Sequence, residues 1–205
     1  MPFTSLGLSP TLLKAIRDEG FPTPTPIQKT AIPAVIHGKD VLGIAKTGSG
    51  KTAGYVLPIL HKLQAASDTQ YREPTVLVLV PTRELADQVQ QVFQTFIPSL
   101  SERVTSLAVY GGASINPQMQ AIGKANIVIA TPGRLLELLE KNAVRLSSIS
   151  TLVLDEADKM LNLGFKEEVD RILTLLPERR QNLLFSATLS DDLGLIQQVL
   201  LHDPL

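Results

Sequence analysis

The sequence contains no cysteine and only three histidines, His37, His61 and His202. Without cysteine the chain forms neither disulfides nor cysteine-based zinc sites, and the three scattered histidines do not suggest a metal site of their own. A bound metal ion would therefore be a hard ion such as Mg²⁺, held by oxygen ligands and phosphates.

The sequence also lacks a long apolar run and a marked charge imbalance. It has no window of about 18 apolar residues, and residues 1–4 lack the basic and apolar regions of a signal peptide. We therefore expect a cytoplasmic protein without a membrane segment. A net charge of −1 argues against gripping nucleic acid by bulk charge, so any nucleic acid would be bound through local contacts. The 205 residues suffice for one well-buried domain, expected to be a monomer.

Short apolar runs rich in Val, Ile and Leu alternate with segments of helical period. The runs cover residues 41–45, 76–80, 105–110, 127–130, 152–154 and 183–185. The helical segments cover residues 9–19, 26–37, 51–65, 83–97, 114–123, 133–141, 166–176 and 191–201. The runs are nearly continuous, as in strands buried on both faces. This alternation predicts an α/β fold with a doubly wound parallel sheet, and the polar stretch 66–73 is expected to be a surface loop.

A glycine-rich turn after the first expected strand is typical of a phosphate-binding loop. It reads Ala45-Lys46-Thr47-Gly48-Ser49-Gly50-Lys51-Thr52. Gly48 and Gly50 can adopt positive φ, so that backbone N–H groups form a cradle for phosphates at the start of the following helix. Lys51 would reach the β- and γ-phosphates, and the Thr52 hydroxyl would ligate Mg²⁺. The general pattern has Gly in place of Ala45, and the alternative is an ordinary Gly/Ser loop.

Small polar or glycine clusters follow almost every expected strand. They are Thr47-Gly48, Pro81-Thr82-Arg83, Gly111-Gly112, Thr131-Pro132-Gly133-Arg134, Asp155-Glu156 and Ser186-Ala187-Thr188. Open α/β sheets bind ligands at the carboxyl ends of their strands. The pattern therefore predicts a large site at that edge.

The run 152–154 leads directly into Asp155-Glu156-Ala157-Asp158. A carboxylate at the end of a buried strand complements a phosphate loop: Asp155 would hold Mg²⁺, directly or through water, and Glu156 would orient or deprotonate the attacking water. The alternative is that these acidic residues cap a helix that starts near Ala157.

The motif Asp155-Glu156-Ala157-Asp158 resembles that of the DEAD-box ATP-dependent RNA helicases, and the whole chain resembles the amino-terminal RecA-like domain of that family. The resemblance covers, in the family's order, Phe3, residues 20–28, 45–52, 81–86, 111–112, 131–134, 155–158 and 186–188. So many segments in one order make the resemblance highly specific. The family's phosphate loop commonly begins with Ala, so Ala45 agrees with it. The compact loops and the lack of a long amino-terminal extension lead us to expect a bacterial member.

The resemblance gives the amino-terminal region a role in reading the nucleotide base. Gln28 matches the family's glutamine at the adenine edge, Phe21 resembles the aromatic that packs on the base, and Phe3 resembles the isolated aromatic upstream. An amide both donates and accepts, which suits the N6/N7 edge of adenine and mismatches guanine. The implied cofactors are ATP and Mg²⁺. Without the resemblance, Gln28 reads as a surface residue of a helix that begins near Pro26.

Further matched segments resemble motifs that contact RNA or couple hydrolysis to strand separation. The implied RNA-binding residues are Pro81, Thr82, Arg83, Gly111, Gly112, Thr131, Gly133 and Arg134, and the implied coupling residues are Asp158, Ser186 and Thr188. No aromatic platform accompanies them, which favours sequence-independent contacts to the RNA backbone. The alternatives are that Thr-Pro-Gly-Arg merely starts a helix, that Arg83 pairs with a nearby Glu, and that Ser186 or Thr188 caps a helix.

The expected organisation is one RecA-like domain, with residues 1–38 as the adenine-reading region and 39–205 as the core. Nothing matches the arginine-rich motifs of the family's second RecA-like domain, so we expect a half that binds nucleotide weakly, hydrolyses ATP barely and does not unwind RNA by itself. A DNA-directed helicase and a non-catalytic nucleotide- or RNA-binding module remain as alternatives. A self-sufficient P-loop kinase or GTPase fits less well, because Asn-Lys-x-Asp is absent.

Overall fold

The computed structural model describes residues 1–65, 73–100, 103–188, 194, 197, 200–202 and 204. The described part of the chain contains a six-stranded sheet in the order β1-β6-β5-β2-β4-β3. Its strands are β1 (Val41–Ile44), β2 (Val76–Leu79), β3 (Ser106–Val109), β4 (Ile127–Ala130), β5 (Thr151–Leu154) and β6 (Gln181–Ser186). All neighbouring strands pair in parallel. The predicted α/β fold with a parallel sheet is thereby confirmed.

The helices are α1 (Pro10–Asp18), α2 (Pro26–Ile36), α3 (Lys51–Ala65), α4 (Arg83–Phe96), α5 (Ile115–Ile122), α6 (Pro132–Glu140), α7 (Ala157–Asn162) and α8 (Lys166–Thr174). Helices α1 and α2 precede β1, helices α3 to α6 each follow one strand and lead to the next, and α7 and α8 both lie between β5 and β6. Short 3₁₀ turns cover Phe3–Ser5 and Ile97–Ser99. The short helix α7 begins where the capping alternative for the acidic motif places it. The expected helix 191–201 and the loop 66–73 lie largely outside the described residues.

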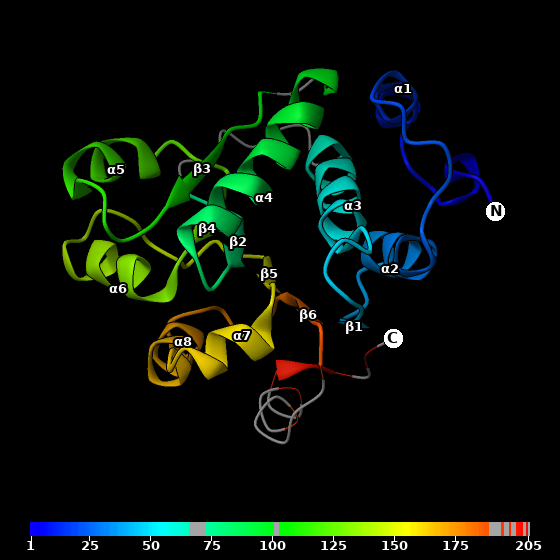
Figure 1. Cartoon of the computed structure of the whole chain (residues 1–205). Coiled ribbons are helices and arrows are strands. Elements are labelled where there is room, and N and C mark those ends of the chain that lie inside the picture. The colour runs from blue at the N-terminus through cyan, green and yellow to red at the C-terminus, as the bar shows by residue number, and fades with distance from the viewer. Residues whose placement is uncertain are drawn as a thin grey trace.

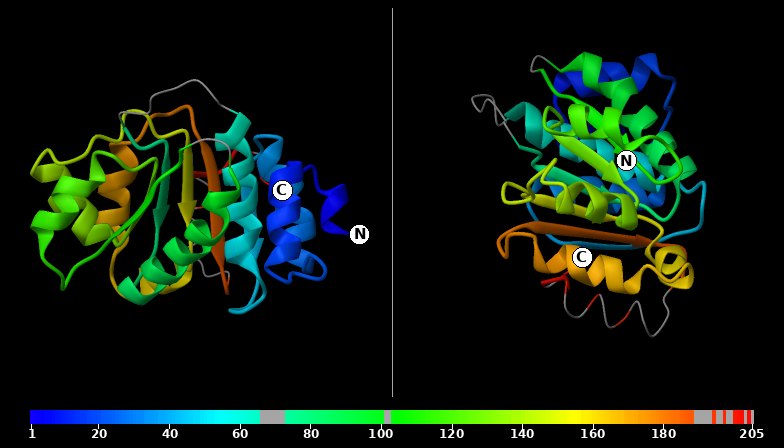
Figure 2. Two further views of the ribbon diagram at one scale, coloured as in Figure 1. Left: turned by 90° about the horizontal axis from the view of Figure 1, so that it is seen from above. Right: turned by 90° about the vertical axis from the view of Figure 1, so that its left-hand side faces the viewer.

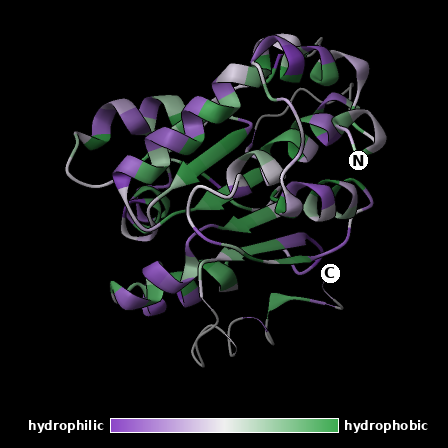
Figure 3. Cartoon of the chain, turned by 45° about the vertical axis from the view of Figure 1, so that its right-hand side comes forward, coloured by the Kyte–Doolittle hydropathy of each residue, from purple (hydrophilic) through white to green (hydrophobic). Residues whose placement is uncertain are grey.

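The sheet lies between two layers of helices (Figures 1 and 2). Helices α1 to α4 cover one face and α5 to α8 cover the other. Successive residues of one strand point to opposite layers: Val76 and Val78 enter the first core, whereas Leu77 and Leu79 enter the second. Figure 3 shows apolar strands between helices of mixed polarity. Burial on both faces explains why the strands read as continuous apolar runs.

Residues 1–38 pack into the first of these cores through Phe3, Leu12 and Ile32. Helix α2 begins at Pro26 because the Gln28 side chain accepts from the Thr25 N–H, and proline suits the first helical position. None of the helices in the described part of the chain combines the length and apolar content that crossing a membrane requires.

Candidate nucleotide-binding and nucleic-acid site

The carboxyl ends of the parallel strands meet at one edge of the sheet. The predicted polar clusters all follow those ends. Residues 45–52 follow β1, 81–83 follow β2, 111–112 follow β3, 131–134 follow β4, 155–156 follow β5, and 186–188 lie at and beyond the end of β6. The fold therefore gathers segments from the whole chain at one edge.

The glycine-rich turn joins β1 to α3, and two of its glycines have the positive φ expected for a loop that turns its N–H groups toward a ligand. Gly48 and Gly50 have φ values of +80° and +88°. A Cβ added to Gly50 would lie 2.6 Å from Gln28 Nε2, so glycine is required there by conformation and by space. The Ser49 hydroxyl is buried without a hydrogen-bond partner. A buried unpaired hydroxyl beside positive-φ glycines fits a loop that receives a polar ligand.

Lys51 is the first residue of α3 and is only 6% exposed. Its Nζ donates to the Ala45 carbonyl at 2.7 Å, so the ammonium lies within the loop. The positive charge also acts on Asp155 across the edge.

Gln28 is 2% exposed and contacts the phosphate loop directly. Its Oε1 accepts from the Thr25 N–H at 3.0 Å, and its Nε2 donates to the Gly50 carbonyl at 3.0 Å. One N–H and one lone pair of the amide remain for another partner. Phe21 packs against Phe96 with ring centroids 5.9 Å apart and stays 36% exposed. Phe96 is the last residue of α4, whereas the first residues of α4 lie at the site edge. Phe21 therefore packs at the end of α4 that lies away from the site.

Asp155 follows β5 and is 2% exposed. Burial raises the pKa of this carboxyl, while the hydrogen bond from Tyr55 and the charge of Lys51 oppose the rise. Its Oδ1 accepts from the Glu156 N–H at 2.9 Å. Glu156 has φ 51° and ψ 48°, a left-handed conformation that is uncommon for a non-glycine residue and recurs at functional sites. The Glu156 carboxylate lies 3.4 Å from Lys159 Nζ.

Asp158 is hydrogen-bonded to Thr188, which lies just beyond the end of β6. Asp158 Oδ2 accepts from the Thr188 hydroxyl at 2.7 Å and from its N–H at 3.0 Å. The Ser186 hydroxyl donates to the Thr188 carbonyl at 2.8 Å. Burial would raise the pKa of Asp158, but hydrogen bonds from Thr188, Ser186 and the backbone together lower it. Motifs 30 residues apart in the sequence are thus joined, while their coupling role stays a prediction.

The segment 81–83 takes the form that one alternative described. Thr82 is the N-cap of α4, and its Oγ1 accepts from the Leu85 N–H at 3.3 Å. Arg83 pairs with Glu84 at 2.6 Å, and both side chains are exposed. A Cβ on Gly112 would lie 3.9 Å from Arg83 Nη1, so the guanidinium lies beside the Gly111-Gly112 loop. An exposed pair of this kind contributes little to stability and exchanges readily for another anion.

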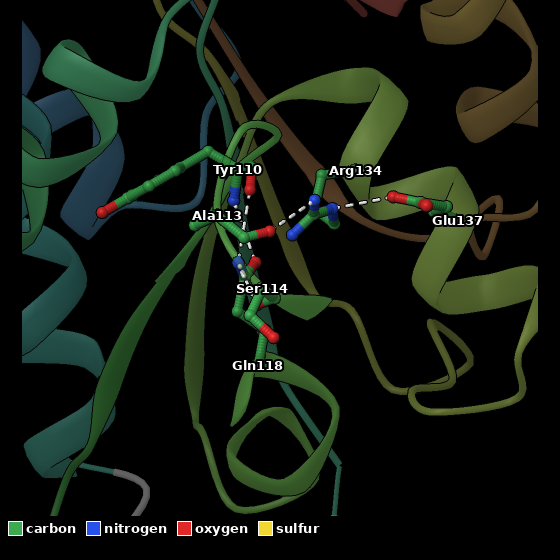
Figure 4. Close-up of polar contacts among 6 residues, drawn as sticks. All are labelled: Tyr110, Ala113, Ser114, Gln118, Arg134 and Glu137. Carbon is green, nitrogen blue, oxygen red and sulfur yellow. Dashed lines mark hydrogen bonds and ion pairs between the residues drawn. The ribbon is translucent and has the colours of Figure 1, made fainter. Parts of the chain in front are cut away.

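The loop from Tyr110 to Ser114 is held by hydrogen bonds to the side chain of Gln118, a residue that the sequence prediction missed (Figure 4). Gln118 of α5 accepts from the Tyr110 N–H at 3.0 Å and donates to the carbonyls of Tyr110 and Ser114, both at 3.2 Å. The Gly111 and Gly112 amides are left at the exposed tip. A glutamine after a double glycine carries no signal of this role by itself.

Arg134 lies under the same loop and is 8% exposed. Its Nη2 donates to the Ala113 carbonyl at 3.0 Å, and its Nε donates to Glu137 at 2.8 Å (Figure 4). Its Nη1 is buried without a partner. Thr131 is the N-cap of α6, and a Cβ on Gly133 would meet nothing within 4 Å. In this structure Arg134 supports the loop, and reaching a phosphate would require it to leave Ala113.

A parallel α/β sheet with a phosphate loop after β1 and an acidic pair after β5 defines a RecA-like P-loop domain. The chain belongs to the DEAD/DEAH box helicase family, which matches residues 25–196. The ATP-dependent RNA helicase DeaD of Buchnera aphidicola is 45% identical over 205 residues, 100% of this chain and 33% of that protein. The helicase CshA of Streptococcus pneumoniae is 48% identical over 192 residues, 93% of this chain and 36% of that protein.

A solved structure shows the same fold. The crystal structure of a DEAD box protein from the hyperthermophile Methanococcus jannaschii superimposes with a TM-score of 0.92 at 35% identity, covering 100% of this chain and 55% of that one. The chain spans about a third of the length of the two curated relatives described above.

Proposed function

We propose that this chain is the ATP-binding domain of an RNA helicase, in which RNA-dependent ATP hydrolysis drives local opening of RNA duplexes. The observation that carries the proposal is the meeting of the phosphate loop, Lys51 and Asp155 at one sheet edge, in a chain whose relatives are named ATP-dependent RNA helicases. A cytoplasmic location agrees with this role.

The triphosphate would lie in the loop formed by residues 47–52. The amides of Gly48 and Gly50 and the free Ser49 hydroxyl would bind phosphate oxygens, and Lys51 would contact the distal phosphates. The donors suit this ligand, because the loop offers N–H, hydroxyl and ammonium groups and little negative charge.

Mg²⁺ would be held by Thr52 and Asp155, partly through water. The described residues contain no cluster of three or more His, Asp or Glu side chains that could ligate a metal. A site with only Thr52 and Asp155 as protein ligands suits a magnesium ion that keeps waters and phosphate oxygens as its other ligands. The ion would neutralise charge that develops on the phosphates. Asp155 would bind this ion in its ionised form, and Glu156 would position the attacking water and accept its proton.

Adenine would be recognised by Gln28, which keeps one donor and one acceptor free. Phe21 would contribute an aromatic surface to the base on leaving Phe96, which ends α4 away from the site edge. Because Gln28 also holds the Gly50 carbonyl, occupancy of the base site would act directly on the phosphate loop.

RNA would bind along the clusters 81–83, 111–112 and 131–134, whose exposed residues are Arg83, Gly111, Gly112 and Gly133. Arg83 lies beside Gly112, and Gly133 has open space around it, so backbone N–H groups and one mobile guanidinium can reach phosphates. Contacts of this kind do not read sequence, which fits a helicase acting on many RNAs.

A second RecA-like domain in the full-length protein would complete the ATP site, with Asp158, Ser186 and Thr188 transmitting its closure. An arginine supplied in trans is worth about 10³ to 10⁵ in rate in phosphoryl-transfer enzymes. Residues 1–205 alone should therefore bind nucleotide weakly and hydrolyse ATP barely. Robust RNA-stimulated turnover by this chain alone would contradict that expectation.

The first test is calorimetric titration of residues 1–205 with ADP and with GDP, each with Mg²⁺. Binding of ADP but not GDP supports both the phosphate loop and the Gln28 assignment. Equal binding keeps the loop and removes the adenine assignment. RNA and DNA duplexes with the same sequence, offered to the full-length protein, then test whether the 2′-hydroxyl matters.

A further inference from the structure

Tyr55 is a buried residue that neither the phosphate loop nor the acidic motif includes. It lies on α3 three residues after Thr52, and its side chain is fully buried. Its ring packs against Phe185 of β6 at a centroid distance of 5.3 Å. A phenylalanine would fill this space equally well. The hydroxyl therefore needs its own explanation, because burying a polar group is costly unless it is hydrogen-bonded.

The Tyr55 hydroxyl contacts Asp155, one of the two residues that are proposed to hold magnesium. It donates to Asp155 Oδ2 at 2.8 Å across 100 residues of sequence. Burial and the neighbouring Asp155 charge raise the pKa of Tyr55 well above its ordinary value, while a hydrogen bond with the Thr52 hydroxyl lowers it. The phenol keeps its proton and remains a donor. The Tyr55 hydroxyl is thus held by Asp155 and lies near the Thr52 side chain.

The Tyr55 hydroxyl and the Glu156 N–H together determine how the Asp155 carboxylate is oriented. The Glu156 N–H binds Oδ1 at 2.9 Å and the Tyr55 hydroxyl binds Oδ2, so each oxygen is held by one donor. Each oxygen keeps a lone-pair direction for another ligand. Without the hydroxyl, one oxygen would be buried with no donor and the carboxylate would be free to rotate.

We propose that Tyr55 is a positioning residue, whose hydroxyl holds the Asp155 carboxylate in the orientation that binds Mg²⁺ together with Thr52 and the nucleotide. The inference rests on the proposed function of Asp155 and Thr52. Tyr55 itself touches neither metal nor phosphate in this scheme. A preorganised carboxylate binds the ion without first having to be ordered.

The test compares Tyr55→Phe with the unchanged chain, residues 1–205, using calorimetric titration of ADP in EDTA and at increasing Mg²⁺. Loss of one hydrogen bond to the ionised Asp155 carboxylate should reduce the Mg²⁺-dependent gain in ADP affinity about 10-fold or more. The affinity measured in EDTA should stay within about twofold, because the loop is untouched. Tyr110→Phe removes another tyrosine–aspartate hydrogen bond, to Asp87 at 3.3 Å, and should change neither affinity.

The outcomes separate this inference from the function on which it rests. An unchanged magnesium gain in Tyr55→Phe, or an equal loss with and without Mg²⁺, would overturn the positioning role and leave the nucleotide site intact. No magnesium gain in the unchanged chain would overturn both. In an Asp155→Asn background, Tyr55→Phe should have no further effect on the magnesium gain, because Tyr55 acts through that carboxylate.

A second measurement applies even where Tyr55→Phe does not fold. The unchanged chain, labelled with ¹³C at tyrosine Cζ, should show the Tyr55 resonance shifting when Mg²⁺ is added to the ADP complex. The shift is expected because Asp155, the acceptor of the Tyr55 hydrogen bond, then also binds the ion. A Tyr55 resonance that ignores Mg²⁺ while the ADP affinity rises would contradict the inference.

Discussion

Replacing Gln118 by Leu should release the loop from Tyr110 to Ser114 without changing the core. The substitution keeps the size of the side chain and removes three hydrogen bonds to the loop backbone. Each is worth about 0.5 to 1.5 kcal/mol net, and the low end applies because water reaches this exposed loop. The loss is therefore about 1.5 kcal/mol, which corresponds to an approximately tenfold higher population of the open loop.

Hydrogen–deuterium exchange of the Tyr110 amide, which donates to Gln118, measures that population. We expect about tenfold faster exchange in Gln118→Leu, confined to the loop, and unchanged exchange in β3. Gln120→Leu on the same helix is the matched control, because the Gln120 side chain is exposed. Unchanged loop exchange in Gln118→Leu would refute the reasoning, as would equal acceleration in the control. If the loop binds RNA, the full-length variant should also lose RNA affinity.

Three further substitutions test the candidate site at the carboxyl edge of the sheet. Lys51→Ala should weaken ADP binding far more than AMP binding, because it removes a contact to the distal phosphates; titration showing equal losses would argue against that contact. Glu156→Gln should preserve ATP binding and abolish turnover of the full-length protein, and normal steady-state turnover would remove it from catalysis. Thr188→Val should lower the free energy of unfolding by about 0.5 to 1 kcal/mol at pH 7, discounted for solvent screening. Because the pKa of Asp158 is lowered on folding, thermal unfolding should show this difference vanishing as the pH falls through that pKa; a constant difference would contradict it.

The sequence alone was sufficient for the fold and for its family. Continuous apolar runs such as 76–80 specify strands buried on both faces, and local helix starts such as Thr25-Pro26 carry their own capping chemistry. The phosphate loop is equally local, since its glycines, Lys51 and Thr52 adjoin one another in the chain. Parallel pairing then places every strand's carboxyl end at one edge, so the location of the site followed from the pattern.

Only the tertiary structure decided which partner each polar side chain takes. Gln28 bonds to the Gly50 carbonyl, Arg134 turns under the loop to Ala113, and the Tyr55 hydroxyl binds Asp155. These partners lie 22, 21 and 100 residues apart in the sequence. Whether a hydrogen bond forms depends on differences of a few tenths of an ångström in the distance between atoms from different elements. Residue type and spacing specify which elements form, whereas the packing of the layers decides which donors and acceptors meet.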